Sequence, residues 1–70
     1  MRIKKEIIID WLESKKWSYV KFCVKAGIKL FDLRKILYDS ESDEFEDVVV
    51  LNINKIAKVI GVNVSELFEN

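Results

Sequence analysis

The sequence predicts a single all-α domain, built as a compact bundle of five short helices. Apolar residues recur at helical spacing along most of the 70-residue chain. Proline is absent, and each of the two glycines, Gly27 and Gly61, follows a helical stretch. Half of the residues are apolar, which is enough for one core and unlike the composition of a disordered chain. We therefore expect one domain over residues 1–70 and no second domain.

The first helix is expected from about Ile3 to Lys16. Its apolar residues recur at helical steps with charged residues between most of them, and they are Ile3, Ile7, Ile8, Trp11 and Leu12. The β-branched run Ile7–Ile9 would suit a strand by itself, but the periodicity over two further turns favours a helix.

The second helix is expected from Tyr19 to Ala26. Ser18 precedes it as an N-cap whose hydroxyl can accept a bond from a backbone amide one turn later. Trp17 and Phe22 occupy the two positions of a hydrophobic staple, which fixes how the chain enters the helix.

A sharp turn at Gly27 is expected to lead into a third helix from about Leu30 to Leu37. Gly27 can adopt the left-handed conformation, and Ile28 is then placed to pack on Cys23. Lys29 is a poor cap for the third helix. The buried side of this helix is expected to consist of Leu33, Ile36 and Leu37.

Residues 38–51 are expected to form an acidic connection. The segment is first rich in Asp, Glu and Ser and then β-branched at Val48–Val50, which predicts an exposed loop that ends in an extended segment. The three valines could anchor this loop or carry a contact between two copies of the chain.

The C-terminal helices are expected within residues 52–69. Asn52 is the expected cap of the fourth helix, and Gly61 is its expected end. Its buried stripe is predicted as Ile53, Ile56, Ala57 and Ile60. Asn63 and Glu66 form a capping box for a short fifth helix, and Phe68 closes the core.

Charge is distributed unevenly along the chain. Residues 1–35 carry ten Lys or Arg against four acids, and residues 36–70 carry two against eight, which gives +6 and −6. The basic half can provide phosphate contacts, whereas the acidic half could repel nucleic acid, bind the basic half of another copy or serve solubility. The isoelectric point of about 6.2 argues against nucleic-acid binding.

Several kinds of chemistry are excluded by composition. The chain has no histidine and one cysteine, so it cannot form a zinc site or a Ser-His or Cys-His nucleophile pair by itself. It has no glycine-rich phosphate loop. We expect no enzyme activity, no metal and no cofactor, with Cys23 as a core residue. The lone cysteine and the lack of a long apolar run predict a cytoplasmic protein that does not enter a membrane.

Two segments of the chain resemble a known family. WSYVKFCVKAGI (residues 17–28) resembles the first helix and turn of the lambda-repressor-like (Cro/XRE-type) helix-turn-helix DNA-binding family, and INKIAKVIGVNVSELF (residues 53–68) resembles its last two helices. This resemblance implies a compact five-helix domain with the motif at about residues 18–37. It also implies a small DNA-binding transcriptional regulator, such as a repressor of phage or mobile-element origin, acting on double-stranded DNA as a monomer or homodimer.

The resemblance also implies which residues contact DNA. The second motif helix would enter the major groove, with further cations of the basic half (Lys15, Lys16, Lys21 and Lys25) available to phosphates. The implied contacts are Tyr19, Lys29, Leu30, Phe31, Asp32, Arg34 and Lys35.

The chain departs from the family pattern at three places. Leu30 and Phe31 stand where the family places side chains that hydrogen-bond to bases. Three alternatives remain open for this pair: contact with thymine methyl groups beside an Asp32 that accepts from cytosine, an apolar face that binds a protein, or burial of one of the two. The protein-binding alternative would make the chain an anti-repressor or adaptor. Leu12 and Leu37 replace a family Arg–Glu pair, so we expect them to pack together. The 38–51 connection is longer than the family norm.

Overall fold

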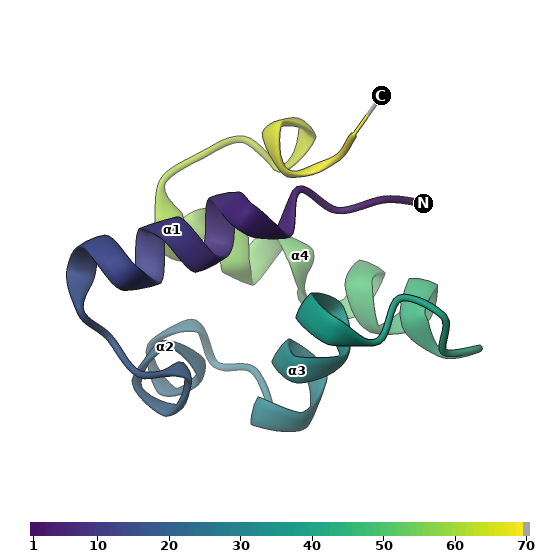
Figure 1. Ribbon diagram of the computed structural model, residues 1–70, viewed down its shortest axis with the longest axis horizontal. Helices are drawn as coiled ribbons and strands as arrows, with labels where there is room; N and C mark the ends of the chain where they lie inside the picture. The colour runs from purple at the N-terminus through teal and green to yellow at the C-terminus, as the bar shows by residue number, and fades with distance from the viewer. Residues whose placement is uncertain (70) are drawn as a thin grey trace.

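The computed structural model describes residues 1–69, and over these residues the chain is helical and has no β-strand (Figure 1). The predicted all-α class is therefore confirmed. The helices are α1 (Lys5–Lys15), α2 (Tyr19–Ala26), α3 (Leu30–Tyr38), α4 (Phe45–Ile60) and the short 3₁₀ helix η1 (Val64–Leu67). The segment expected to form a fifth α-helix is instead a 3₁₀ helix of four residues. Helical segments this short commonly adopt the tighter 3₁₀ form.

At the junction of α1 and α2 the predicted Ser18 cap is confirmed. Lys16 ends α1 in the left-handed conformation with φ of 58°. Ser18 caps α2, since its Oγ accepts from the backbone N–H of Lys21 at 3.1 Å. Trp11 packs edge-on against both Trp17 and Phe22, with ring centroids 5.1 and 5.9 Å away. These contacts fix the entry of the chain into α2.

Both glycines end helices in the left-handed conformation. Gly27 has φ of 73° and Gly61 has φ of 86°. At the first turn the N–H of Ile28 donates to the carbonyl of Cys23 at 3.0 Å, and at the second the N–H of Val62 donates to the carbonyl of Ala57 at 3.1 Å. Both corners therefore have the six-residue hydrogen bond typical of a glycine-terminated helix.

The predicted connection over residues 38–51 is wrong in its second half. Only residues 39–44 lie between α3 and α4, and the Val48–Val50 segment is helical. Val49 and Phe45 continue the apolar stripe of the later isoleucines one and two turns toward the N-terminus, respectively. Burial of one long stripe outweighs the strand preference of the valines. Asn52 is consequently not a cap: it lies in the middle of α4 and is buried.

One core joins all of the helices. Leu12 and Leu37, which we expected to pack together, are both buried within it. Its fully buried side chains come from every element: Ile8, Phe22, Leu33, Leu37, Val49, Ile56 and Leu67. A large-to-small change at such a position costs about 2–5 kcal/mol.

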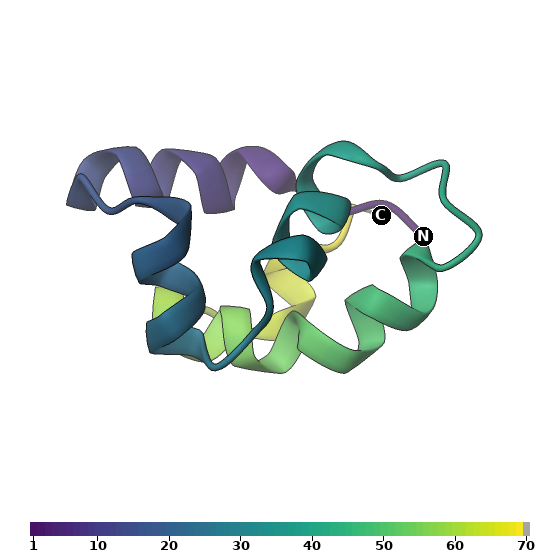
Figure 2. The ribbon, with the colours of Figure 1, turned by 90° about the horizontal axis from the view of Figure 1, so that it is seen from below.

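The two ends of the described chain pair with each other. Ile3 and Phe68 form an isolated antiparallel bridge, with Lys4 N–H donating to the Leu67 carbonyl at 2.8 Å. Figure 2 shows the N-terminal segment beside the C-terminal one, with α1 and α4 along opposite sides of the molecule. No helix among residues 1–69 is long and apolar enough to cross a bilayer.

Candidate nucleic-acid interface

The start of α3 has backbone donors that no side chain caps. Lys29 occupies the cap position in an extended conformation and makes no side-chain cap bond. The first N–H that donates to a residue of this turn is that of Leu33, to the Lys29 carbonyl at 3.0 Å. The earlier N–H groups of α3 thus lack an intrahelical acceptor, and such groups can bind a phosphate oxygen.

The structure separates the two apolar residues at this helix start. Phe31 is 68% exposed, whereas Leu30 is half-buried and packs against the core. Lys29 and Arg34 are exposed. Leu30 is therefore partly buried, as one of the three alternatives for this pair expected. Phe31 points outward and is available for contact with DNA or with a protein.

Asp32 is tied to the body of the domain. Its Oδ2 accepts a hydrogen bond from the Asn52 side-chain amide at 3.1 Å, and Asn52 is only 2% exposed. Burial raises the pKa of the neighbouring Cys23 thiol, and the Asp32 charge raises that pKa further. Asp32 thus has an acceptor oxygen fixed from behind by α4, and Cys23 is a core thiol.

Lys35 is also engaged within the chain. Its Nζ donates to Ser42 Oγ at 3.2 Å, lies 3.6 Å from Asp39 Oδ2 and sits 4.9 Å from the centre of the Phe31 ring. Its side chain is only 11% exposed. Among the implied contacts on α3, Arg34 is therefore the side chain with free positive charge. A shallow hollow of about 150 Å³ lies between Phe31, Arg34, Lys35 and Asp39.

Tyr19, at the start of α2, pairs with Tyr38, at the end of α3. The two hydroxyls hydrogen-bond to each other, and the rings lie at a tilt with centroids 6.4 Å apart. This hydrogen bond, followed by partial burial, raises the pKa of Tyr19 above 10.0. Tyr19 is therefore a neutral hydroxyl held beside α3.

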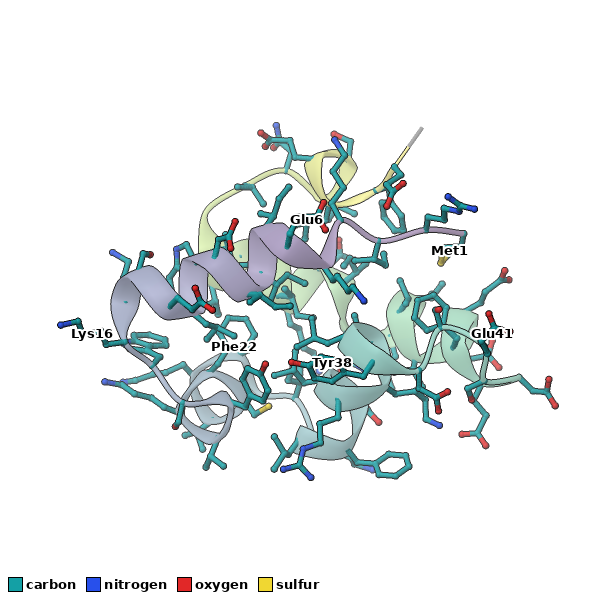
Figure 3. All side chains as sticks on the ribbon, in the orientation of Figure 1. Met1, Glu6, Lys16, Phe22, Tyr38 and Glu41 are labelled. Atoms are coloured by element: carbon teal, nitrogen blue, oxygen red, sulfur yellow. The ribbon has the colours of Figure 1, made fainter. Side chains whose placement is uncertain are left out.

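The four further cations of the basic half lie on the exposed surface of α1, α2 and the turn between them, and they are Lys15, Lys16, Lys21 and Lys25. Lys21 Nζ lies 4.8 Å from the Trp17 ring, and Lys15 Nζ lies 5.8 Å from the Trp11 ring. Figure 3 places Lys16 at one end of the molecule and Glu41 at the other. The two halves are not separated throughout, because Arg2 and Lys5 line one cavity together with Glu41.

Sequence reasoning missed three residues that shape this surface: Asn52, Ser42 and Tyr38. Asn52 has a visible signal, because it interrupts the apolar stripe of α4 at a core-facing position. Tyr38 has no such signal, because its partner Tyr19 lies 19 residues earlier in the chain. Ser42 has none either, because it reaches Lys35 only when the loop folds back on α3.

The chain matches no protein-family model and no curated protein. It does match solved structures over its whole length. These include native PhpD with cadmium atoms, at TM-score 0.67 and 21% identity, and PhpD with cadmium complexed with hydroethylphosphonate, at TM-score 0.66 and 21% identity. A mutant of hydroxyethylphosphonate dioxygenase is similar at TM-score 0.69 and 23% identity.

This similarity concerns the fold alone. The chain covers 14% of each of those structures, so it corresponds to a small part of a much longer protein. Residues 1–69 contain no cluster of three or more His, Cys, Asp or Glu side chains that could hold a metal ion. The same helical arrangement thus occurs inside a protein named as a dioxygenase, and fold by itself does not assign a function to this chain.

Proposed function

We propose that this chain is a small DNA-binding transcriptional regulator that contacts duplex DNA with the start of α3. The observation that carries the proposal is the uncapped first turn of α3, flanked by the exposed cations Lys29 and Arg34. Backbone donors with nearby positive charge are well suited to bind phosphate oxygens. The resemblance to the lambda-repressor-like family points to the same helix.

The proposal assigns different roles to the residues at this surface. Lys29 and Arg34 contact phosphates, and the exposed ring of Phe31 touches the methyl groups of thymine in the major groove. Tyr19 adds a neutral hydroxyl from α2. Of the acidic 39–44 loop, Asp39 lines the same hollow as Arg34, and its carboxylate lies 3.6 Å from Lys35 Nζ, so its charge is offset within the chain.

The test is a titration of the labelled chain with random-sequence duplex DNA at several salt concentrations. We expect binding that weakens with salt, by a log–log slope of about −0.9 for each phosphate contacted. Lys29→Ala and Arg34→Ala should each lower the affinity and make the slope shallower by about 0.9. Lys5→Ala, which removes an exposed charge at the start of α1, is the matched control and should leave the slope unchanged.

Absence of binding at low salt would reject the proposal. An equal effect of Lys5→Ala and Arg34→Ala would reject the placement of DNA on α3, because it would indicate general electrostatic attraction only.

Phe31 favours a second candidate function, a protein-interaction module such as an anti-repressor or adaptor. An aromatic ring that is 68% exposed, beside a hollow and rimmed by charge, has the anatomy of an interface anchor. A photo-crosslinking amino acid in place of Phe31 separates the two functions in cells. Crosslinks to DNA support the regulator, and crosslinks to one protein species support the interaction module.

A further inference from the structure

Two exposed apolar pairs lie on helices that the proposed DNA interface does not use for base contact. On α2, Val20 and Val24 are 57% and 75% exposed. On α4, Val50 and Leu51 are 65% and 66% exposed. Val20 and Val24 are four residues apart and share one outward face of their helix. Each pair exposes apolar surface that folding leaves uncovered.

The charges beside the two pairs have opposite signs. Lys21 and Lys25, both exposed, follow the valines of α2 directly in sequence. Glu46 and Asp47, both exposed, lie one helical turn before Val50 and Leu51 on α4. We call the first set the α2 patch (Val20, Lys21, Val24, Lys25) and the second set the α4 patch (Glu46, Asp47, Val50, Leu51).

The two patches lie toward opposite ends of the molecule. In Figure 1 α2 is at the left, and the N-terminal half of α4 is at the right of the longest dimension, which measures 30 Å. One copy therefore cannot bring its own patches together. A second copy can, because its α4 patch is free to approach the α2 patch of the first.

We propose that the chain associates with a second copy of itself, with the α2 patch of one copy against the α4 patch of the other. In this contact the apolar side chains of one patch pack against those of the other, and the lysines face the carboxylates. Apolar burial and the attraction between opposite charges therefore both favour association. The formal net charge of 0 leaves no overall repulsion between copies. Because the contact is head to tail, it can extend beyond two copies.

The contact is small and partly ionic, so it is weak and sensitive to salt. Each patch offers only two apolar side chains at its centre, which is less than a permanent dimer requires. Screening at high salt removes the attraction between the lysines and the carboxylates. The proposal is independent of DNA binding, because its test contains no DNA.

The test is sedimentation velocity of the full chain over a range of concentrations, at low and at high salt. The wild-type mass should rise with concentration at low salt and fall toward the monomer at high salt. Two double variants each disable one patch by neutralising its charges: Lys21→Gln with Lys25→Gln, and Glu46→Gln with Asp47→Asn. Each variant alone should remain a monomer.

Mixing the two variants gives the decisive measurement. The first keeps an intact α4 patch and the second keeps an intact α2 patch, so an equimolar mixture should form a heterodimer and stop there. Glu6→Gln with Asp10→Asn neutralises two exposed acids of α1 and is the matched control, which should associate like the wild type. A wild type that is monomeric throughout, or a mixture that remains monomeric, would overturn the proposal. Circular dichroism checks that each variant is folded.

Discussion

The side-chain amide of Asn52 joins α4 to the start of α3, because it donates both to Asp32 Oδ2 at 3.1 Å and to the Val48 carbonyl at 2.9 Å. Asn52 is the buried polar residue in an otherwise apolar helix face. Both of its amide hydrogens are used, so its burial does not leave a donor without a partner. The contact therefore ties the first turn of α3 to the middle of α4.

We predict that Asn52→Ala lowers the free energy of unfolding by about 2 kcal/mol, because hydrogen bonds to a charged group are worth more than neutral ones. The measurement is urea unfolding followed by circular dichroism. Asn54→Ala removes an exposed asparagine from the same helix and should change stability by no more than about 0.5 kcal/mol. Equal effects of the two substitutions would show that the Asp32 contact does not stabilise the fold.

Asn52 also shows where sequence reasoning ends. An asparagine before an apolar stripe is a good helix cap, and this local rule predicted a helix starting at residue 52. The actual helix starts at Phe45, since its stripe includes Phe45 and Val49 and tertiary burial outweighs the strand preference of three valines. Local rules did succeed at Ser18, Gly27 and Gly61, because caps and left-handed turns depend on residues close in sequence.

The left-handed Lys16 provides a second prediction. A side chain with a Cβ is strained at φ of 58°, and glycine is not. Lys16→Gly should therefore raise the free energy of unfolding by about 0.5–1 kcal/mol, a gain reduced by the larger freedom of glycine in the unfolded chain. Lys15→Gly, at the last residue of α1, should instead destabilise the domain. Urea unfolding measures the free energy of unfolding of both variants and of the wild type. Destabilisation by Lys16→Gly would contradict the prediction.

The Tyr19–Tyr38 pair predicts a dependence of stability on alkaline pH. The pKa of Tyr19 is raised above 10.0 in the folded state, so folding favours the protonated phenol. Its contribution to stability is complete below pH 10.0 and is lost as the pH rises through the raised folded-state pKa. Urea unfolding at pH values on both sides of 10.0 should show this fall. The fall should be smaller in Tyr19→Phe.

Tyr19→Phe should not abolish the fall, since the raised pKa of Cys23 acts in the same direction above its ordinary value of 9.0. A Tyr19→Phe profile identical to that of the wild type would show that the tyrosine hydroxyl is not linked to folding.

The candidate DNA surface was less predictable than the fold. The resemblance placed seven residues on it by their order in the chain, but order does not tell which charges are already engaged. Asp32 and Lys35 both have partners contributed by later segments, Asn52 and Ser42, that come close only after folding. Lys29, Phe31 and Arg34 remain exposed.

This difference predicts that Lys35 and Arg34, adjacent in sequence, behave in opposite ways. Lys35 bonds to Ser42, pairs with Asp39 and has its Nζ 4.9 Å from the centre of the Phe31 ring, so Lys35→Ala should lower the free energy of unfolding by about 1 kcal/mol. Because its charge is already used within the chain, Lys35→Ala should leave the salt slope of duplex binding unchanged.

Arg34→Ala should do the reverse, with stability changed by no more than about 0.5 kcal/mol and a shallower salt slope. Unfolding curves and salt titrations of the two variants, measured side by side, check both halves of this prediction. A shallower slope in Lys35→Ala would mean that Lys35 leaves Ser42 and Asp39 when DNA binds. The intramolecular contacts would then compete with phosphate instead of preventing its approach.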